Sequence, residues 1–382
     1  MLSSELKDTF LTLVRLGIGH GMVNGSRLTV QGSIDWQALK ALADKQGLSA
    51  IVLDGLDKCH TDTTESSDVL PLQMKLEWIG DVLQNYEQRY EQYKRTIAEM
   101  AAFYEERGYK MMVLKGYACS LDWPKPNHRP CGDIDIWQFG QQRFADLLLE
   151  RKNIEVDISH HHHTVFYWGD FMVENHYDFL NVHHHKSNVE MEGILKELAS
   201  DPEKAKNVEM SVVRQLDGGE KEEVKVTVYL PSANLHALFL LRHTMSNFAS
   251  TGMQLRQLMD WGFLVEKHGN EIDWDWLESQ IEYFGMKKLY DIFNAILVGD
   301  LGFSVKNFPK VQFDPKLKDR VLDEILSPEF SEKEKGWIFR RAIFKFRRWK
   351  ANQWKHELCF KESMWSAFWS GVWSHLLKPS SI

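Results

Sequence analysis

Two short segments, close together in the sequence, constrain the fold more than any other feature. The first, Val113-Leu114-Lys115-Gly116-Tyr117, predicts a strand that ends in a glycine turn, and the second, Gly132-Asp133-Ile134-Asp135-Ile136, predicts another strand. Because successive side chains of a strand point to opposite faces, Asp133 and Asp135 are expected on one face and the two isoleucines on the other. Two such carboxylates repel each other unless a cation lies between them, and their oxygen ligands suit Mg²⁺. Since a glycine turn lets backbone N–H groups approach a phosphate, the two segments together predict metal-assisted transfer from a nucleotide.

A third acidic residue is predicted on a later strand. Group transfer with two metal ions needs another carboxylate on a neighbouring strand, and Val173-Glu174-Asn175-His176-Tyr177 supplies one. We expect Glu174 to bind metal and to act as general base towards an acceptor hydroxyl. His176 shares its face of the strand and is expected to orient Glu174 or to contact the substrate. The alternative interpretation is the polar outer face of an antiparallel hairpin.

Composition narrows the class of protein. The chain has 382 residues, 43% of them hydrophobic and 26% charged, as in soluble globular proteins of two or three domains. A formal net charge of −8 disfavours non-specific binding to long nucleic acids. The 4 cysteines form no CxxC pair, which indicates reduced thiols rather than a disulfide framework. No signal peptide or membrane-spanning segment is visible, so we expect a cytoplasmic protein.

The predicted elements change in character along the chain. Asp35 is expected to cap a helix that ends at Gly47, and a long helix is expected over residues 72–106. A tight turn at Gly169-Asp170 is expected to join two strands. The expected strands are 109–114, 133–136, 154–158, 164–168, 171–177 and 224–230, with a helix at 144–152 and polar loops at 61–68 and 216–220. The expected domains are an N-terminal helical region (1–108), an α/β core (109–230) and a C-terminal helical domain (231–382).

The order of the motifs resembles the uncharacterised nucleotidyltransferase family within the DNA polymerase β-like superfamily. The resemblance rests on Leu114-Lys115-Gly116, on Arg129-Pro130-x-Gly132-Asp133-Ile134-Asp135 and on the segment around Glu174. It extends to Leu241-Arg242-His243-Thr244-Met245-Ser246-Asn247-Phe248 and to Gly252-x-x-Leu255-Arg256-Gln257-Leu258-x-Asp260-Trp261. It implies an α+β fold with a polymerase β-like core of mixed sheet and helices, flanked by helical regions. It also implies transfer of a nucleoside monophosphate from an NTP, such as ATP, to an unidentified acceptor, with release of pyrophosphate.

The resemblance also implies roles for individual residues. Asp133, Asp135 and Glu174 would bind two Mg²⁺ ions, with Mn²⁺ as the alternative. The residues expected to bind the nucleotide are Lys115, Gly116, Tyr117, Arg129 and Gly132. The wider superfamily has a second small residue where this chain has Tyr117, and Lys115 is expected to supply compensating positive charge.

A helix of the later segment carries two further charged residues expected near the substrate cleft. Arg256 and Asp260 are four residues apart and so share a helix face, where they either pair with each other or project into the cleft.

Two histidine clusters, residues 160–163 and 183–185, would suit Zn²⁺ or Ni²⁺ in principle. If the first cluster were a strand, alternate rings would face opposite ways, which argues against one site made of four histidines. We expect some rings, among them His162, to line the substrate cleft beside Glu174 and others to lie at the surface. An alternative hypothesis for these clusters is that the protein is a hydrolase with a histidine-bound transition metal.

The C-terminal region combines basic and aromatic residues. Residues 340–350 are strongly basic, and Trp365, Trp369 and Trp373 recur every four residues. We expect the tryptophan stripe to pack on the body of the protein, with an anionic partner or a membrane surface as the alternative for this region. For the whole chain, Tyr117 motivates an alternative function, a catalytically weak nucleotidyltransferase-like binding or regulatory module.

Overall fold

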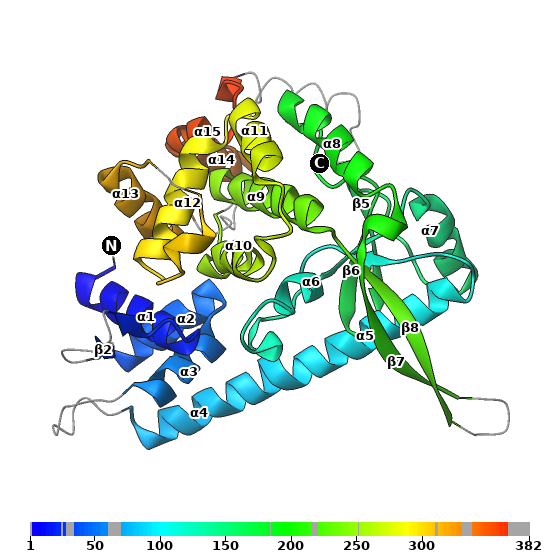
Figure 1. Cartoon of the computed structure of the whole chain (residues 1–382), viewed down its shortest axis with the longest axis horizontal. Coiled ribbons are helices and arrows are strands. Elements are labelled where there is room, and N and C mark those ends of the chain that lie inside the picture. The colour runs from blue at the N-terminus through cyan, green and yellow to red at the C-terminus, as the bar shows by residue number, and fades with distance from the viewer. Residues whose placement is uncertain are drawn as a thin grey trace.

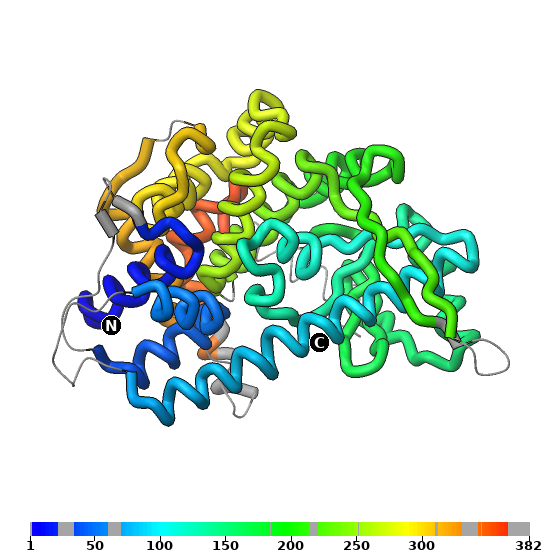
Figure 2. The backbone as a smooth tube through the Cα atoms, turned by 60° about the horizontal axis from the view of Figure 1, so that its bottom comes forward, coloured from blue at the N-terminus to red at the C-terminus, as the bar shows by residue number. Residues whose placement is uncertain are grey.

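The computed structural model describes residues 2–23, 26–27, 34–59, 70–183, 185–215, 221–250, 252–309, 312–330 and 338–365. A sheet with its own helices lies at one end of the molecule, and N- and C-terminal helices gather at the other end (Figure 1). One long helix runs along the side of the molecule and joins the two ends (Figure 2). This α+β architecture agrees with the predicted fold class.

The N-terminal region is helical, as predicted. It contains α1 (Ser4–Gly17), the short hairpin β1 (Met22–Val23) and β2 (Ser26–Arg27), α2 (Trp36–Gln46) and α3 (Ser49–Lys58). Asp35 caps α2 by accepting a hydrogen bond from the backbone N–H of Ala38, and Gly47 ends the helix with a φ of 65°. Both of these predictions are therefore confirmed. The predicted loop at 61–68 lies outside the described residues.

The long predicted helix is also present. α4 (Leu72–Val82) continues through a π-helical segment, η2 (Leu83–Gln88), into α5 (Arg89–Glu105). Buried side chains of α5, such as Tyr93 and Ile97, share a hydrophobic core with the sheet. Helix α5 therefore packs as part of the α/β core. The predicted domain boundaries stay a prediction.

The sheet has six strands in the order β5-β6-β4-β3-β8-β7. β4 pairs antiparallel with β3 and parallel with β6, while β3 pairs parallel with β8, so the sheet is mixed. The outer pairs β5–β6 and β7–β8 are antiparallel. The strands are β3 (Met112–Val113), β4 (Ile134–Trp137), β5 (His163–Trp168), β6 (Phe171–His176), β7 (Lys206–Gln215) and β8 (Lys221–Leu230).

Most predicted strands of the core are found, with three differences. The strand expected at 109–114 is reduced to β3. The strand expected at 154–158 is wrong, because only Asp157 bridges Val165. The Asp157 carboxylate then accepts a hydrogen bond from the Ser159 backbone N–H, and the resulting turn ends the pairing. Strand β7 was not predicted, and residues 216–220 after it lie outside the described residues.

The two faces of the sheet have different neighbours. Ile134, Ile136 and Val173 lie in the core formed with α5 and α7 (Gln142–Arg151). The opposite face carries Asp135 and Glu174 and looks towards the helices that follow the sheet. Helix α8 (Lys186–Leu198), between β6 and β7, was not predicted, whereas α9 (Ala233–Ala249), after β8, was.

The remaining helices form the C-terminal part. They are α10 (Leu255–His268), α11 (Trp274–Tyr283), α12 (Lys287–Gly299), α13 (Pro315–Leu326), α14 (Ile338–Ala351) and α15 (Gln353–Cys359). Their apolar side chains form one continuous core with those of α1, α2 and α3. Across the described ranges, every helix is too short or too polar to span a lipid bilayer.

The predicted tryptophan stripe is only partly described. Trp365 is 58% exposed, and its ring centroid lies 5.0 Å from that of Trp349 in the basic helix α14. Trp369 and Trp373 lie outside the described residues, so packing of the stripe stays a prediction.

Candidate active site

A cavity of about 450 Å³ lies between the acidic face of the sheet, α9 and α10. It brings together every predicted site residue except Tyr117, although these residues are spread over more than a hundred positions of the chain. The lining residues are Lys115, Gly116, Arg129, Gly132, Asp133, Asp135, His162, His163, Glu174, His176, Phe179, Leu240, His243, Thr244, Asn247, Arg256, Gln257 and Asp260.

The three predicted acids converge in this cavity. Asp135 and Glu174 are direct neighbours across the parallel pair β4–β6, and Asp133 precedes β4 and lines the same cavity. Burial and the nearby charges of Asp135 and Glu174 raise the pKa of Asp133. The Asp133 carboxylate makes no hydrogen bond or ion pair with any other described residue, so it can accept an incoming cation.

Two cationic groups neutralise Asp135. Lys115 Nζ lies 2.7 Å and His176 Nε2 3.0 Å from Asp135 Oδ1. Burial opposes ionisation, but the charge of Lys115 and the hydrogen bond from His176 hold the pKa of Asp135 well below its usual range. Burial likewise disfavours the charged form of His176, yet hydrogen bonds to Asp135 and Glu174 raise its pKa to about 9. Asp135 is therefore ionised.

The glycine turn after β3 fits closely against α5. Gly116 has a φ of 52°, a conformation that other residues adopt at a cost. A Cβ atom at this position would lie 2.2 Å from the Tyr93 hydroxyl, which itself donates a hydrogen bond of 2.9 Å to the Asp133 carbonyl. The Tyr93 side chain thus links the glycine turn and α5 to the backbone of Asp133.

In the structure the Arg129 side chain is paired with a carboxylate of α10. Its side chain is 5% exposed and forms a bidentate ion pair with Asp260, with Nε–Oδ1 and Nη2–Oδ2 distances of 2.8 Å. Trp123 also donates a hydrogen bond to Asp260. This pairing joins the loop before Asp133 to α10, and nucleotide binding by Arg129 stays a prediction.

Arg256 and Asp260 do not pair with each other. Arg256 Nε donates to the Gln254 side chain at 2.9 Å, and Nη1 donates to the Pro130 carbonyl at 3.3 Å. Burial and the charge of Arg129 lower the pKa of Arg256. Arg256 contacts no carboxylate directly among the described residues, so it is better suited than Arg129 to meet an anionic ligand.

The side chain of Tyr117 does not line the cavity. It is 5% exposed and packs in the core under the sheet, with its ring 6.3 Å from that of Tyr90. The reason is that α6 (Tyr117–Ser120) begins directly after Gly116 and turns its first side chain towards α5. A nucleotide contact by this side chain is therefore not supported.

Two of the clustered histidines enter the cavity together. Only His163 of the first cluster belongs to β5, so the alternation of a strand does not apply to the preceding residues. His162 and His163 consequently both approach His176, with ring centroids 5.6 and 5.3 Å away. Burial lowers the pKa of His162 to about 2 and that of His163 to about 4, so both rings are neutral.

Sequence reasoning missed several residues of the cavity wall. His243, Thr244 and Asn247 come from α9, and His243 Nε2 accepts a hydrogen bond of 3.1 Å from Asn247 Nδ2. Their signal was present, because they lie within the segment 241–248 that carries the family resemblance. Nothing local in that segment indicated that its polar side chains would face the sheet.

The acids fit a divalent metal ion. Asp133 has an unpartnered carboxylate, and the ionised Asp135 lines the same cavity. Glu174 lies directly across from Asp135. These are hard oxygen donors of the kind that Mg²⁺ prefers.

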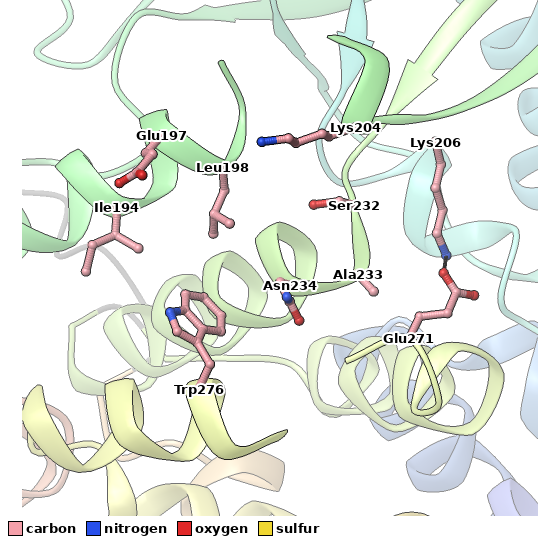
Figure 3. Close-up of a pocket in the computed structure, with 10 residues that line it drawn as sticks. All are labelled: Ile194, Glu197, Leu198, Lys204, Lys206, Ser232, Ala233, Asn234, Glu271 and Trp276. Carbon is pink, nitrogen blue, oxygen red and sulfur yellow. Dashed lines mark ion pairs between the residues drawn. The ribbon is translucent and has the colours of Figure 1, made fainter. Parts of the chain in front are cut away.

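A second cavity, of about 510 Å³, lies between α8, α11 and the beginning of α9 (Figure 3). It contains none of the predicted site residues. Its Lys206 and Glu271 form an ion pair of 2.7 Å across one end, and Trp276 reaches towards Asn234 in its middle. Its lining lacks a cluster of acids and histidines like that of the carboxylate cavity, which is therefore the better candidate for chemistry.

Comparison with known proteins agrees with the class that the fold and site define, which is nucleotidyltransferase. The model of a family described as uncharacterised nucleotidyltransferase matches residues 32–295. This match covers well over half of the chain, and the chain therefore belongs to that family. No curated protein and no solved structure shows significant similarity to it.

Proposed function

We propose that this nucleotidyltransferase uses Mg²⁺ to transfer a nucleoside monophosphate from an NTP to an acceptor, with release of pyrophosphate. The observation that carries the proposal is the convergence of Asp133, Asp135 and Glu174 on one cavity beside a glycine turn. We also propose that the sheet is a polymerase β-like core. Its support is the order of a glycine turn after β3, paired acids at the adjacent antiparallel β4, and a third acid on β6 parallel to β4.

In this proposal Asp133, Asp135 and Glu174 would hold Mg²⁺, which when bound neutralises phosphate charge during transfer. The backbone of the turn at Gly116 and the cations Lys115 and Arg256 face the phosphates. Lys115 stays charged, since although burial opposes it the acids around it raise its pKa.

Glu174 is suited to take a proton. Burial, the largest single influence, would raise its pKa, but the neighbouring His176, His163 and Lys115 together outweigh burial, and its pKa is lowered. As a carboxylate it accepts the proton of an acceptor hydroxyl while that oxygen bonds to the α-phosphorus. The bond from the α-phosphorus to its bridging oxygen breaks, and pyrophosphate leaves with the electron pair.

The first test measures binding and turnover separately. Calorimetric titration with each NTP, with and without Mg²⁺, is expected to show Mg²⁺-dependent binding that Asp133→Ala plus Asp135→Ala abolishes. Asp170→Ala, in the exposed hairpin turn, is the control and should leave binding unchanged. Glu174→Gln should retain NTP binding but slow pyrophosphate release by about 10²–10⁴-fold. Wild-type binding by the double variant would refute the proposal.

One observation favours a second function, a binding or regulatory module without catalysis. Lys115 and His176 already neutralise Asp135 without a metal ion. A module of this kind would be stabilised by an NTP equally well with EDTA and with Mg²⁺, and would release no pyrophosphate. Thermal shift in the two buffers distinguishes the two functions.

A further inference from the structure

Three imidazole rings meet at the edge of the carboxylate cavity. One nitrogen atom from each of His162, His163 and His176 lies within 4.8 Å of the other two. His163 and His176 are direct neighbours across the antiparallel pair β5–β6, so the rigid sheet holds two of the three rings. The ring centroids of His162 and His163 are 4.3 Å apart.

Two of these rings present buried nitrogen atoms without partners. Nδ1 of His162 and Nδ1 of His163 are inaccessible to solvent and form no hydrogen bond with the described residues. His163 as a whole is only 6% exposed. Buried polar atoms normally have a hydrogen-bond partner, so a pair of unpartnered nitrogen atoms beside a cavity points to a ligand that binds them.

The third ring is oriented for coordination. His176 Nδ1 lies 3.0 Å from the Asp178 carbonyl oxygen, to which it can only donate, so Nδ1 carries a hydrogen atom. Its Nε2 is therefore the atom that points towards the acids, and a metal ion bound there would replace the proton that Nε2 donates to Asp135. Metal-binding histidines usually donate their other N–H group to a carbonyl or carboxylate in this way.

The Glu174 carboxylate lies close to two of the three rings, and it also forms a close group with Asp135 and His176. Its Oε2 lies 3.6 Å from His163 Nδ1 and 3.5 Å from His176 Nε2. Both distances are long for hydrogen bonds. They are close to the edge of a zinc coordination tetrahedron, which is about 3.3 Å for metal–ligand bonds of about 2.0–2.1 Å.

We propose that His162, His163 and His176 form a binding site for one divalent transition-metal ion, best matched by Zn²⁺, with the Glu174 carboxylate beside it. Imidazole nitrogen suits zinc and its neighbours in the periodic table, whereas Mg²⁺ prefers oxygen. This site is distinct from the one proposed for Mg²⁺, with Glu174 lying between the two. It needs no nucleotide, so it stands or falls independently of nucleotidyl transfer.

The test uses the full chain without an affinity tag, stripped of metal by a chelator and titrated with Zn²⁺ against a chromophoric competitor. We expect one ion per chain, and at least about tenfold weaker binding after His162→Ala plus His163→Ala. The matched control is His161→Ala plus His183→Ala, which also removes two neighbouring histidines, with ring centroids 4.9 Å apart. This control should bind like the wild type, and an excess of Mg²⁺ should not displace the ion.

Two results would overturn the site. One is the absence of stoichiometric Zn²⁺ binding by the wild type, and the other is equal loss of affinity in both double variants. Should the first double variant fail to fold, X-ray absorption at the zinc edge of the wild-type protein still decides the matter. Three imidazole ligands support the site, and a shell of oxygen ligands alone excludes it.

Discussion

At the scale of single residues, burial keeps several histidines of this protein neutral. His236 lies in α9, is 5% exposed, and has its Nε2 3.5 Å from the Cys119 sulfur. Burial lowers its pKa to about 4, although Asp122 and Asp260 act in the opposite direction. The folded protein therefore resists a proton that the unfolded chain accepts.

This shift predicts a loss of stability in acid. The pKa of His236 is lower in the folded state than the ordinary value of about 6.5 in the unfolded chain. The neutral ring therefore makes its full contribution to the free energy of unfolding above pH 6.5. This contribution is lost as the pH falls towards 4. Denaturant unfolding of His236→Gln between pH 6.5 and 4 should show a shallower pH dependence than the wild type, by up to about 1.4 kcal/mol per pH unit.

The control for this prediction is a non-ionisable neighbour in the same helix. Leu235→Ala should lower the free energy of unfolding by about 2–5 kcal/mol at every pH and leave the slope unchanged. An unchanged slope in His236→Gln would show that burial does not govern this ring.

The residues around Asp135 show which features of the site could be predicted from the sequence and which could not. Alternation along a strand predicted that Asp135 would face away from Ile134 and Ile136, and this orientation is confirmed. The pairing of Arg129 with Asp260 was not predictable, because it joins residues far apart in sequence through a fold that local patterns do not specify. The residue types alone also did not indicate whether Arg129 or Arg256 would form an ion pair.

At the scale of elements, the turn between β3 and α6 is the most demanding connection at the site. Gly116→Ala adds a methyl group 2.2 Å from the Tyr93 hydroxyl and forces a φ of 52° on a residue that disfavours it. We expect a loss of about 1–3 kcal/mol in the free energy of unfolding, measured with denaturant. Because Tyr93 holds the Asp133 carbonyl, NTP binding should weaken as well.

A helical glycine provides the matched control. Gly193 in α8 has no atom within 4 Å of the position that a Cβ would take. Gly193→Ala should therefore stabilise the protein by about 0.5–1 kcal/mol, through the higher helix propensity of alanine. The turn hypothesis fails if alanine at Gly116 is tolerated as well as alanine at Gly193.

The helices and strands that were predicted have clear capping residues or hydrophobic periodicity. In those that were missed, these sequence patterns are weak. Asp35 and Gly47 mark both ends of α2 through capping chemistry that acts within a few residues. In β7, Val208, Met210 and Val212 do alternate towards the core, but polar and charged residues surround them. In α8 the helical spacing of apolar residues is weak, because the segment contains a glycine and follows a histidine cluster. Packing against α9 stabilises this helix, and that contact could not be predicted from the local sequence.

At the scale of the whole molecule, the two ends of the chain form one core. The described residues of α1, α2 and α3 share a continuous hydrophobic cluster with α10, α12 and α13. The arrangement in Figure 1 follows from this, because the long helix α4–α5 carries the chain from that core to the sheet. The N-terminal helices and the C-terminal helices should therefore unfold together.

Gln46 at the end of α2 lies at the centre of this connection. Its side chain is 1% exposed, donates to the carbonyls of Ile325 and Leu326 at 3.0 and 3.2 Å, and accepts from the Leu255 N–H at 2.8 Å. Gln46→Ala leaves these backbone groups of α13 and α10 buried without partners, at a cost of about 1–3 kcal/mol. Denaturant unfolding followed by circular dichroism and by tryptophan fluorescence should show one lowered midpoint common to both probes. Gln73→Ala on the exposed face of α4 should change the free energy by no more than about 0.5 kcal/mol, and separate transitions for the two probes would contradict a shared core.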